Sequence, residues 1–309
     1  MDRLNYLYEN AKEVNIDNGS SIVFISDIHR GDGTYSDSLI ANKNIYKTAL
    51  SYYYRRGFTY VEVGDGDELW KNSNYSDIAY VYNDVFKILN KFKEENRLYL
   101  IYGNHDIIKS KDSFYIDQLK TLKKIGVRYG NSFLKLIKDI EFYEGLNFRY
   151  MPLNEKFLVT HGHQADFINY KLWKSSRFLV RHVWKFLNGV AGFKDPTSPA
   201  KNNKKGSTID KKLEKWSKEN SKMIICGHTH NSRMPEVKEG AYFNDGCCVL
   251  PFAMTTIEIE ASNISLVKWN IDSEQNGVLR VKRKVILGPR KLEDYLLACK
   301  NDIINKEKI

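Results

Sequence analysis

The sequence lacks any apolar stretch long enough to cross a lipid bilayer. Its longest apolar runs, which end at Ser26 and Thr160, are only a handful of residues long, whereas a membrane-spanning helix needs about 20 residues. The N-terminal residues mix charges of both signs and show no apolar core followed by small residues, as a secretory signal would. We therefore expect no transmembrane segment and a cytoplasmic location.

Cysteine is also scarce. The 309 residues include four cysteines, none in a CxxC spacing and two of them adjacent. This arrangement is poorly suited to a disulfide framework. We expect reduced, mostly buried thiols at Cys226, Cys247, Cys248 and Cys299.

Lysine and arginine outnumber the acidic residues, which gives a formal net charge of +10. A basic protein favours anionic partners, so phosphorylated metabolites, nucleic acid and an acidic membrane surface are all compatible with the sequence. Hydrophobic residues make up 42% of the chain, enough for one large α/β domain or two ordinary ones. The composition does not indicate an oligomeric state.

Short apolar runs of the length of buried strands recur along the chain. Five of them cover residues 21–26, 59–64, 97–102, 156–160 and 222–226. Helix-like periodicity between the first three, over 38–56 and 75–94, predicts βαβ units and a largely parallel sheet. Three later runs, at 242–245, 255–260 and 264–271, follow one another without helices. We expect these to form a second sheet packed on the first, in an α/β sandwich with helices outside.

Residues 165–221 interrupt this alternation with dense aromatic and cationic residues, and their polar stretch at 196–208 is typical of a flexible loop. We interpret 165–221 as a helical cap inserted into a catalytic domain of residues 1–270. Residues 271–309 are expected to be a C-terminal extension, packed on the core or partly solvated.

Histidines are few but clustered, because six of the seven lie in four short segments. These are DIH at 27–29, GNHD at 103–106, HGH at 161–163 and GHTH at 227–230, and GDGDE at 64–68 adds carboxylates. Each of the five segments directly follows one of the five apolar runs. All should therefore emerge at the carboxyl ends of strands, where open α/β sheets build their sites.

These segments offer imidazoles, carboxylates and one amide, a ligand set that suits manganese, iron, zinc or similar divalent ions. One such ion takes about four to six ligands, whereas at least seven are present, so two ions that share a bridging carboxylate fit the set better. Glycines at 64, 103, 162 and 227 permit the tight turns that bring the ligands together.

The five motifs in this order resemble the calcineurin-like metallophosphoesterase superfamily over about residues 21–270. The resemblance implies a two-sheet αββα sandwich and two divalent cations, with manganese favoured and iron or zinc as alternatives. It implies hydrolysis of a phosphodiester, pyrophosphate or phosphomonoester bond by a hydroxide that bridges the ions. The implied ligands are Asp27, His29, Asp65 and His230 for one metal, and Asp65, Asn104, His161 and His228 for the other.

Two further roles follow from the same resemblance. His105 would contact the phosphate and help to stabilise or protonate the leaving oxygen, with Asp106 orienting its ring. The sequence leaves His163 open between a place beside the metals or substrate and a structural role. Asp67 and Glu68 are open as well, between orienting Asp65 or contacting substrate and being solvated carboxylates.

The inserted segment carries a basic amphipathic helix, in which Lys171, Lys174, Arg177, Arg181 and Lys185 recur every three or four residues. Three interpretations of this face are open. It could be a solvated cationic surface, a lid in which Arg177 and Arg181 bind a phosphate-rich substrate, or an interfacial helix that docks on anionic lipid. The insertion and the GD-x-x-E pattern are similar to the UDP-2,3-diacylglucosamine pyrophosphohydrolase branch, although this chain has His105 where that branch usually has arginine. A phosphorylated nucleotide-like or lipid-like substrate is expected.

Two rival functions stay open. The first is a nuclease acting on DNA or RNA, because other branches of the superfamily are nucleases and the chain is basic. The second is a scaffold that binds proteins without catalysis, but such members usually lack one or more ligands, and this chain has the full set.

Overall fold

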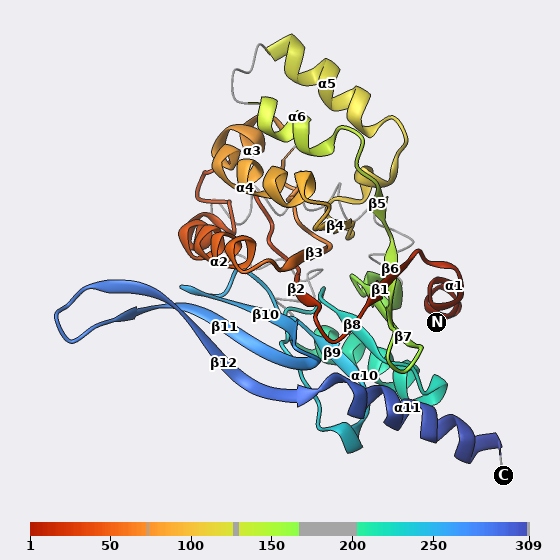
Figure 1. The fold of residues 1–309 in the computed structure, drawn as a ribbon. Helices are drawn as coiled ribbons and strands as arrows, with labels where there is room; N and C mark the ends of the chain where they lie inside the picture. The colour runs from red at the N-terminus through yellow and green to blue at the C-terminus, as the bar shows by residue number, and fades with distance from the viewer. Residues whose placement is uncertain (73, 126–129, 167–202, 308–309) are drawn as a thin grey trace.

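The computed structural model describes residues 1–72, 74–125, 130–166 and 203–307. The described residues form two β-sheets with helices on the outer face of each (Figure 1). The helices are α1 (Asp2–Asn10), α2 (Lys43–Arg55), α3 (Ser76–Val81), α4 (Asn83–Glu94), α5 (Phe114–Ile125), α6 (Asn131–Ile137), α10 (Asn203–Asn220) and α11 (Leu292–Glu307). No described helix is both long and apolar enough to cross a membrane.

The larger sheet has seven strands in the order β12-β11-β10-β2-β3-β4-β5. Its strands are β2 (Ser21–Ile25), β3 (Thr59–Val63), β4 (Leu98–Ile101), β5 (Phe142–Tyr143), β10 (Ala253–Glu260), β11 (Asn263–Ser273) and β12 (Leu279–Lys291). Strands β2 to β5 run parallel, whereas β10 pairs antiparallel with β2 and continues into the antiparallel β11 and β12.

The smaller sheet has five strands in the order β1-β6-β7-β8-β9. These are β1 (Glu13–Ile16), β6 (Gly145–Tyr150), β7 (Glu155–Thr160), β8 (Ile224–Cys226) and β9 (Tyr242–Asn244). Strands β7, β8 and β9 are parallel to one another, and β6 is antiparallel to β7.

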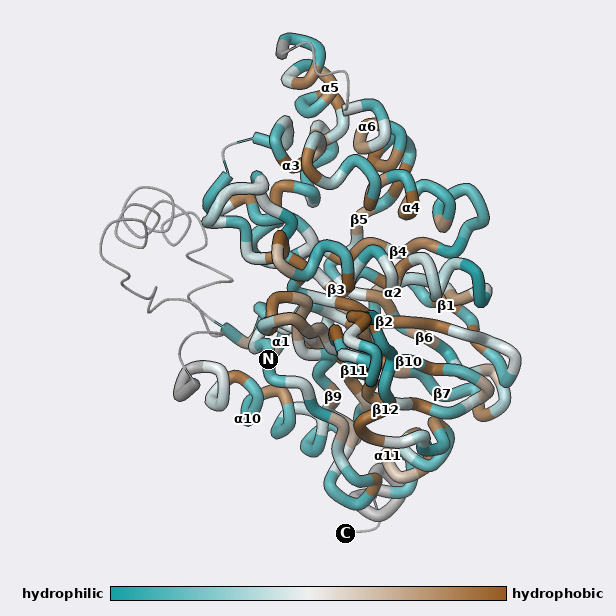
Figure 2. Tube along the Cα trace, turned by 90° about the vertical axis from the view of Figure 1, so that its left-hand side faces the viewer, coloured by the Kyte–Doolittle hydropathy of each residue, from teal (hydrophilic) through white to brown (hydrophobic). Residues whose placement is uncertain are grey.

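Successive side chains of a strand point to opposite faces of its sheet, so each buried strand contributes to two hydrophobic layers. In β2, Val23 and Ile25 face the cluster under α2 and α4, whereas Ile22 and Phe24 face the cluster between the two sheets. On the far side of the smaller sheet, Leu158 packs with residues of α1 and α10. Hydrophobic residues accordingly gather along the central strands in Figure 2, and hydrophilic residues on the outer faces of the helices. The structure confirms the predicted two-sheet αββα sandwich.

All five apolar runs that precede the motifs are strands, namely β2, β3, β4, β7 and β8, as predicted. The distribution of strands between the sheets was predicted wrongly. Strands β10 and β11 extend the first sheet instead of forming the second, because β10 covers the free edge of β2. Alternation specifies which face of a strand is buried, but it does not specify the neighbouring strand.

The predicted loop at 196–208 is wrong for residues 203–208, which form the first turns of α10. This helix packs on the smaller sheet through Ile209, Leu213 and Trp216, which lie on one face. The basic helix expected between Lys171 and Lys185 lies outside the described residues.

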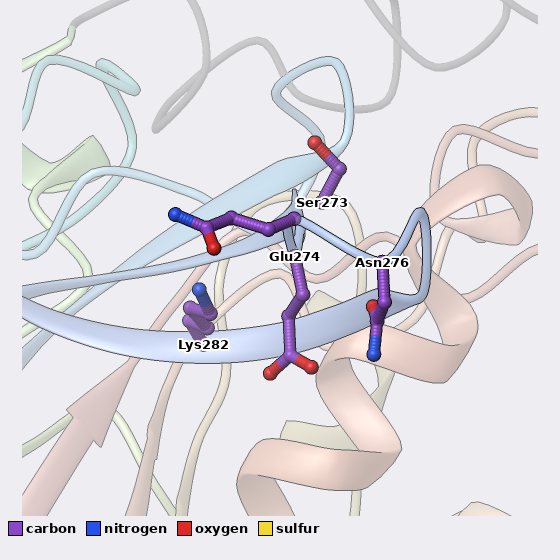
Figure 3. Close-up of a pocket in the computed structure, with 5 residues that line it drawn as sticks. Ser273, Glu274, Asn276 and Lys282 are labelled. Carbon is purple, nitrogen blue, oxygen red and sulfur yellow. The ribbon is translucent and has the colours of Figure 1, made fainter.

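Residues 271–309 contain the end of β11, all of β12 and α11. The β11–β12 hairpin projects from the body of the molecule (Figure 1), and α11 packs through Leu292, Tyr295 and Leu296 against the core between the sheets. A hollow at the hairpin bend is lined by Ser273, Glu274, Gln275, Asn276 and Lys282 (Figure 3). Its charged residues are paired on the hairpin, Glu274 with Arg280 at 3.1 Å and Lys282 with Asp272 at 3.3 Å.

Candidate metal centre

The histidine and aspartate motifs follow the carboxyl ends of β2, β3, β4, β7 and β8, which belong to both sheets. The structure brings these ends together. Three groups of side chains each place their ligand atoms within 4.8 Å of one another. The groups are Asp27 with His29 and His230, His29 with Asp65 and His105, and Asp65 with His161 and His228. Because Asp65 and His29 each belong to two groups, the three form one continuous cluster.

The first group gathers around Asp27. Its Oδ1 lies 2.9 Å from Nε2 of His230 and 3.7 Å from Nε2 of His29. The two Nε2 atoms are 3.4 Å apart. One carboxylate oxygen and two ring nitrogens thus converge on one point, an arrangement that suits a divalent ion.

The other two groups share Asp65. Its Oδ2 is 3.2 Å from Nε2 of His161 and 4.0 Å from Nε2 of both His29 and His105. This oxygen therefore lies between His29, which belongs to the first group, and His161. A ligand that bridges two ions would occupy such a position.

Several of these atoms are buried and make no hydrogen bond to any described residue. Asn104 Oδ1 is one of them. Asp27 Oδ1, His161 Nε2 and His228 Nε2 also lack a hydrogen bond but lie 2.9, 3.2 and 3.5 Å from His230, Asp65 and Asp166. A buried polar atom without a partner costs about 1–3 kcal/mol, so a cluster of them is unfavourable unless a ligand satisfies it. Divalent cations fit this donor set of carboxylate and amide oxygens and imidazole nitrogens.

In three of the ligands the opposite atom is held by the protein. Asp27 Oδ2 accepts hydrogen bonds from Ser26 Oγ at 2.6 Å and from the backbone N–H of His228 at 2.7 Å. Asp65 Oδ1 accepts one from the backbone N–H of His105 at 2.8 Å. His161 Nδ1 lies 2.9 Å from the carbonyl oxygen of Val63 and donates to it, which directs Nε2 into the cluster.

Five of these residues have left-handed backbone conformations, which non-glycine residues rarely adopt. The φ angles are 48° at Asp27, 52° at His29, 51° at Asp65, 69° at His228 and 60° at His230. Each such residue costs on the order of 1–3 kcal/mol, and strain of this kind concentrates at functional sites. The turns after β2, β3 and β8 therefore hold ligands at a cost in stability.

Close packing of the turns depends on glycine at two points. A Cβ at Gly103 would lie 2.1 Å from Asp65 Oδ1, and one at Gly227 would lie 2.1 Å from Ser26 Oγ. Neither contact is possible, so a side chain at either position would push a ligand carboxylate out of place. This extends the sequence argument, which assigned these glycines to tight turns.

Charge in the metal-free cluster favours bound cations. Burial lowers the pKa of His29, but the carboxylates of Asp27 and Glu68 outweigh burial and raise this pKa to about 9. Burial likewise opposes the protonation of His161, and Asp65 and Asp27 outweigh it, so that its pKa is also about 9. Protons therefore occupy nitrogens that a metal would take, and the two compete.

His105 lies at the edge of the cluster, and its ring is oriented by a residue other than the one expected. Its Nδ1 is 2.8 Å from Glu68 Oε1, and its ring stacks on Trp70 at a centroid distance of 4.2 Å. Asp106 instead accepts hydrogen bonds from the backbone N–H groups of Gly66 and Gly103 at 3.0 and 2.8 Å. The prediction that Asp106 orients the His105 ring is therefore wrong, because its carboxylate is used to join two loops.

Glu68 and Asp67 are buried, at 2% and 1% exposure, so neither is a solvated carboxylate. Glu68 Oε2 also lies 3.4 Å from Nδ1 of His29, and it therefore contacts two of the clustered histidines. The sequence signal for this role was the spacing of three residues after Asp65, which places Glu68 at the end of the same turn.

Asp67 belongs to a second buried group, which we term the ion-pair cluster and which sequence reasoning missed. Its members are Arg30, Glu62, Asp67, Asp106 and Lys109. Arg30 forms two hydrogen bonds of 2.9 Å with Glu62, and Lys109 lies 2.6 Å from Asp106 and 2.8 Å from Asp67. The cluster adjoins the metal centre because Asp106 holds the loops that carry Asp65 and Asn104.

The remaining predicted residues are placed as follows. His163 is buried, and its ring lies 5.5 Å from the ring of His161 and 6.4 Å from that of His228. Burial lowers its pKa well below the ordinary value, so the ring is neutral. Arg177 and Arg181 lie outside the described residues.

Similarity to known proteins rests on a family model that covers most of the chain. No curated protein matches the chain. Among solved structures, the chain is similar to Vps29 of Chaetomium thermophilum, with 8% identity, a TM-score of 0.37, and coverage of 87% of this chain and 96% of that chain. The family model for calcineurin-like phosphoesterases matches residues 20–232, which include all five motifs. The chain therefore belongs to the calcineurin-like phosphoesterase family.

Proposed function

We propose that the chain is a phosphoesterase that requires two divalent cations, with manganese favoured over iron or zinc. The observation that carries the proposal is the buried cluster of carboxylate and imidazole groups that shares Asp65 and His29, together with the buried Asn104 Oδ1, which has no hydrogen-bond partner in the described residues. One ion would take Asp27, His29, Asp65 and His230, and the other would take Asp65, Asn104, His161 and His228. Divalent ions held by these residues would supply an activated water and would neutralise charge on a phosphoryl group.

The chain's own residues orient these ligands and supply a proton. Hydrogen bonds from Ser26 and from the backbone of His105 and His228 leave one oxygen of each ligand carboxylate for metal. His105 remains 17% exposed at its side chain, whereas the side chains of Asp27 and His161 are fully buried. His105 therefore lies where a substrate can reach it.

His105 would act as the general acid. Its Nδ1 is held by Glu68, and its Nε2 points toward the cluster, 4.0 Å from Asp65 Oδ2. The Glu68 carboxylate accepts a hydrogen bond from Nδ1–H and so orients the ring with Nε2 toward the place of the leaving oxygen. Asp106 supports this arrangement indirectly through the backbone of both loops.

The substrate is proposed to be a phosphorylated small molecule or a lipid-like molecule with a phosphodiester or pyrophosphate bond. The net charge of +10 supports an anionic substrate. The bond type and the cytoplasmic location rest on the sequence alone.

The experiment is a substrate screen of the Mn²⁺-loaded protein against phosphomonoesters, aryl phosphodiesters, nucleotide pyrophosphates and single-stranded DNA, with Asp65→Asn as the blank. We expect turnover of at least one small phosphoester that disappears in the blank. Hydrolysis confined to DNA, with affinity falling steeply between about 50 and 200 mM salt, would support the nuclease instead. A fully metallated protein that hydrolyses none of these compounds would contradict the proposal.

A further inference from the structure

The hydroxyl of Ser26 lies between two buried carboxyl groups. Its Oγ is 2.6 Å from Asp27 Oδ2 and 2.5 Å from Asp245 Oδ1. A third and longer contact, of 3.4 Å, joins it to the carbonyl oxygen of Gly246. Ser26, Asp27 and Asp245 are each at most 1% exposed, so bulk water does not reach these contacts.

Counting protons shows that one of the two carboxyl groups is protonated. A hydroxyl carries one hydrogen and donates one hydrogen bond, whereas an ionised carboxylate can only accept. Two short contacts between one hydroxyl and two carboxyl oxygens therefore need a second proton. Distances of 2.5–2.6 Å are typical of hydrogen bonds between O–H and carboxylate groups.

The surroundings place that proton on Asp245. Asp27 Oδ2 also accepts from the backbone N–H of His228 at 2.7 Å, and its Oδ1 faces His230 at 2.9 Å, so Asp27 is stabilised as an anion. Asp245 Oδ2 makes no hydrogen bond within the described part of the chain. Burial raises the pKa of Asp245 well above its usual value, and a neutral acid is far less costly to bury than an anion.

We propose that Asp245 is a neutral carboxylic acid that positions the metal ligand Asp27 through Ser26. Asp245 donates its proton to Ser26 Oγ in a hydrogen bond, and Ser26 donates to Asp27 Oδ2. Together with the His228 backbone this occupies Oδ2 fully, so Asp27 offers only Oδ1 to a metal. The inference rests on the proposed function in taking Asp27 as a ligand.

The fold brings this acid to its place from the other sheet. Asp245 directly follows β9, and its backbone N–H donates to the carbonyl oxygen of Cys226 in β8 at 3.0 Å. Ser26 directly follows β2 in the larger sheet. A Cβ at Gly227 would lie 2.4 Å from Ser26 Cβ, so glycine at 227 is what lets the two sheets approach here. The chain Asp245–Ser26–Asp27 thus joins both sheets beneath the metal centre.

Asparagine at position 245 tests this assignment, because an amide N–H can donate in place of an acid O–H. We expect the Mn²⁺ affinity of Asp245→Asn, measured by calorimetry, to match that of the wild type. Asp245→Ala and Ser26→Ala should each weaken it about 10- to 100-fold, the usual effect of removing a group that orients a metal ligand. Infrared spectra of the metal-free protein should show the carbonyl band of a protonated carboxylic acid, and Asp245→Asn should lack that band.

Equal losses of affinity in Asp245→Asn and Asp245→Ala would overturn the inference, as would the absence of the protonated-acid band from the wild type. If Asp245→Ala does not fold, Ser26→Ala decides alone, and wild-type Mn²⁺ affinity in that variant contradicts the positioning role. Failure of the wild type to bind two Mn²⁺ ions would instead count against the proposed function. The metal titration of the wild type therefore separates the two ideas.

Discussion

Two buried clusters of carboxylates adjoin each other in this protein, and their negative charge is neutralised in different ways. In the ion-pair cluster, Glu62, Asp67 and Asp106 place their oxygens within 4.8 Å of one another, as the candidate metal ligands do. Arg30 and Lys109 neutralise them from within the chain. In the metal centre, Asp27 and Asp65 pair only with histidines among the described residues.

This difference teaches that proximity of carboxylates does not by itself identify a metal site. The distinguishing feature is whether the buried ligand atoms already have partners. Asn104 Oδ1 lacks a hydrogen-bond partner within the described residues, and His161 Nε2 faces the Asp65 carboxylate without a hydrogen bond, whereas the ion-pair cluster contains its own cations. The candidate metal centre therefore suits cations from solution, whereas the ion-pair cluster already holds Arg30 and Lys109.

Asp65→Asn is expected to have the largest effect on this comparison. It removes the charge of the oxygen that lies between His29 and His161, so two bound ions would lose the carboxylate proposed as their shared ligand. Turnover should fall by about 10³-fold or more, corresponding to about 4 kcal/mol, and metal retention should weaken. Steady-state kinetics with metal analysis checks this, with Asp272→Asn, on the exposed hairpin, as the control. Near-normal turnover by Asp65→Asn would contradict the bridging role.

Lys109→Met tests the other cluster through stability. Removing a buried cation leaves carboxylates without compensation, which typically costs about 3–5 kcal/mol. Urea unfolding of the metal-free protein should show this loss. Lys135→Met is the matched control, because Lys135 pairs with Glu94 on the surface at 65% side-chain exposure and should cost less than about 1 kcal/mol. Equal losses in the two variants would mean that the ion-pair cluster does not stabilise the fold.

Glu68→Gln is expected to have a smaller effect, on turnover. The amide keeps the shape of Glu68 but replaces the carboxylate that orients the His105 ring with a neutral group. The turnover number should fall about 10- to 100-fold, less than the 10²- to 10⁴-fold or so expected for removal of the acid itself in His105→Ala. Single-turnover kinetics at saturating Mn²⁺ measures both variants. A turnover number for Glu68→Gln equal to that of the wild type would remove Glu68 from the mechanism.

The smallest expected effect is proton release when metal binds. The pKa values of His29 and His161 are about 9 without metal, so both rings are protonated at pH 7. A ligand nitrogen must be neutral, so binding expels these protons and the affinity for Mn²⁺ rises with pH up to about 9. Calorimetry in buffers of different ionisation enthalpy counts the protons. Binding at pH 7 without proton release would show that the rings are already neutral.

The sequence was sufficient to predict the strands that carry the site. Each of the five runs is short, apolar and followed at once by its motif, so local pattern alone places residues such as Asp27 and His161 at strand ends. Convergence within each sheet follows from the shared edge of its parallel strands, whereas the meeting of the two sheets at these edges does not follow from local pattern. The partner of each strand was not predictable, as the misplaced β10 and β11 show, because pairing depends on edges that a local pattern does not record.

Contacts between distant parts of the chain were also beyond sequence reasoning. The hydrogen bond between Ser26 and Asp245 joins residues 219 positions apart, and nothing in either local sequence indicates it. The role of Glu68 was predicted only in part. Its spacing from Asp65 is evident from the sequence, but its burial is not. Strand β12 was missed because most of its residues are exposed, so that it shows no apolar alternation.

The most direct test of the account is a count of metal ions in the protein. Elemental analysis after equilibration with excess Mn²⁺, combined with anomalous scattering from crystals, gives both number and position. We predict two ions per chain, one beside Asp27 and one beside His161, with Asp65 Oδ2 between them, and none in the ion-pair cluster. A site that stays empty in excess metal, or an ion bound between Glu62 and Asp106, would contradict the account.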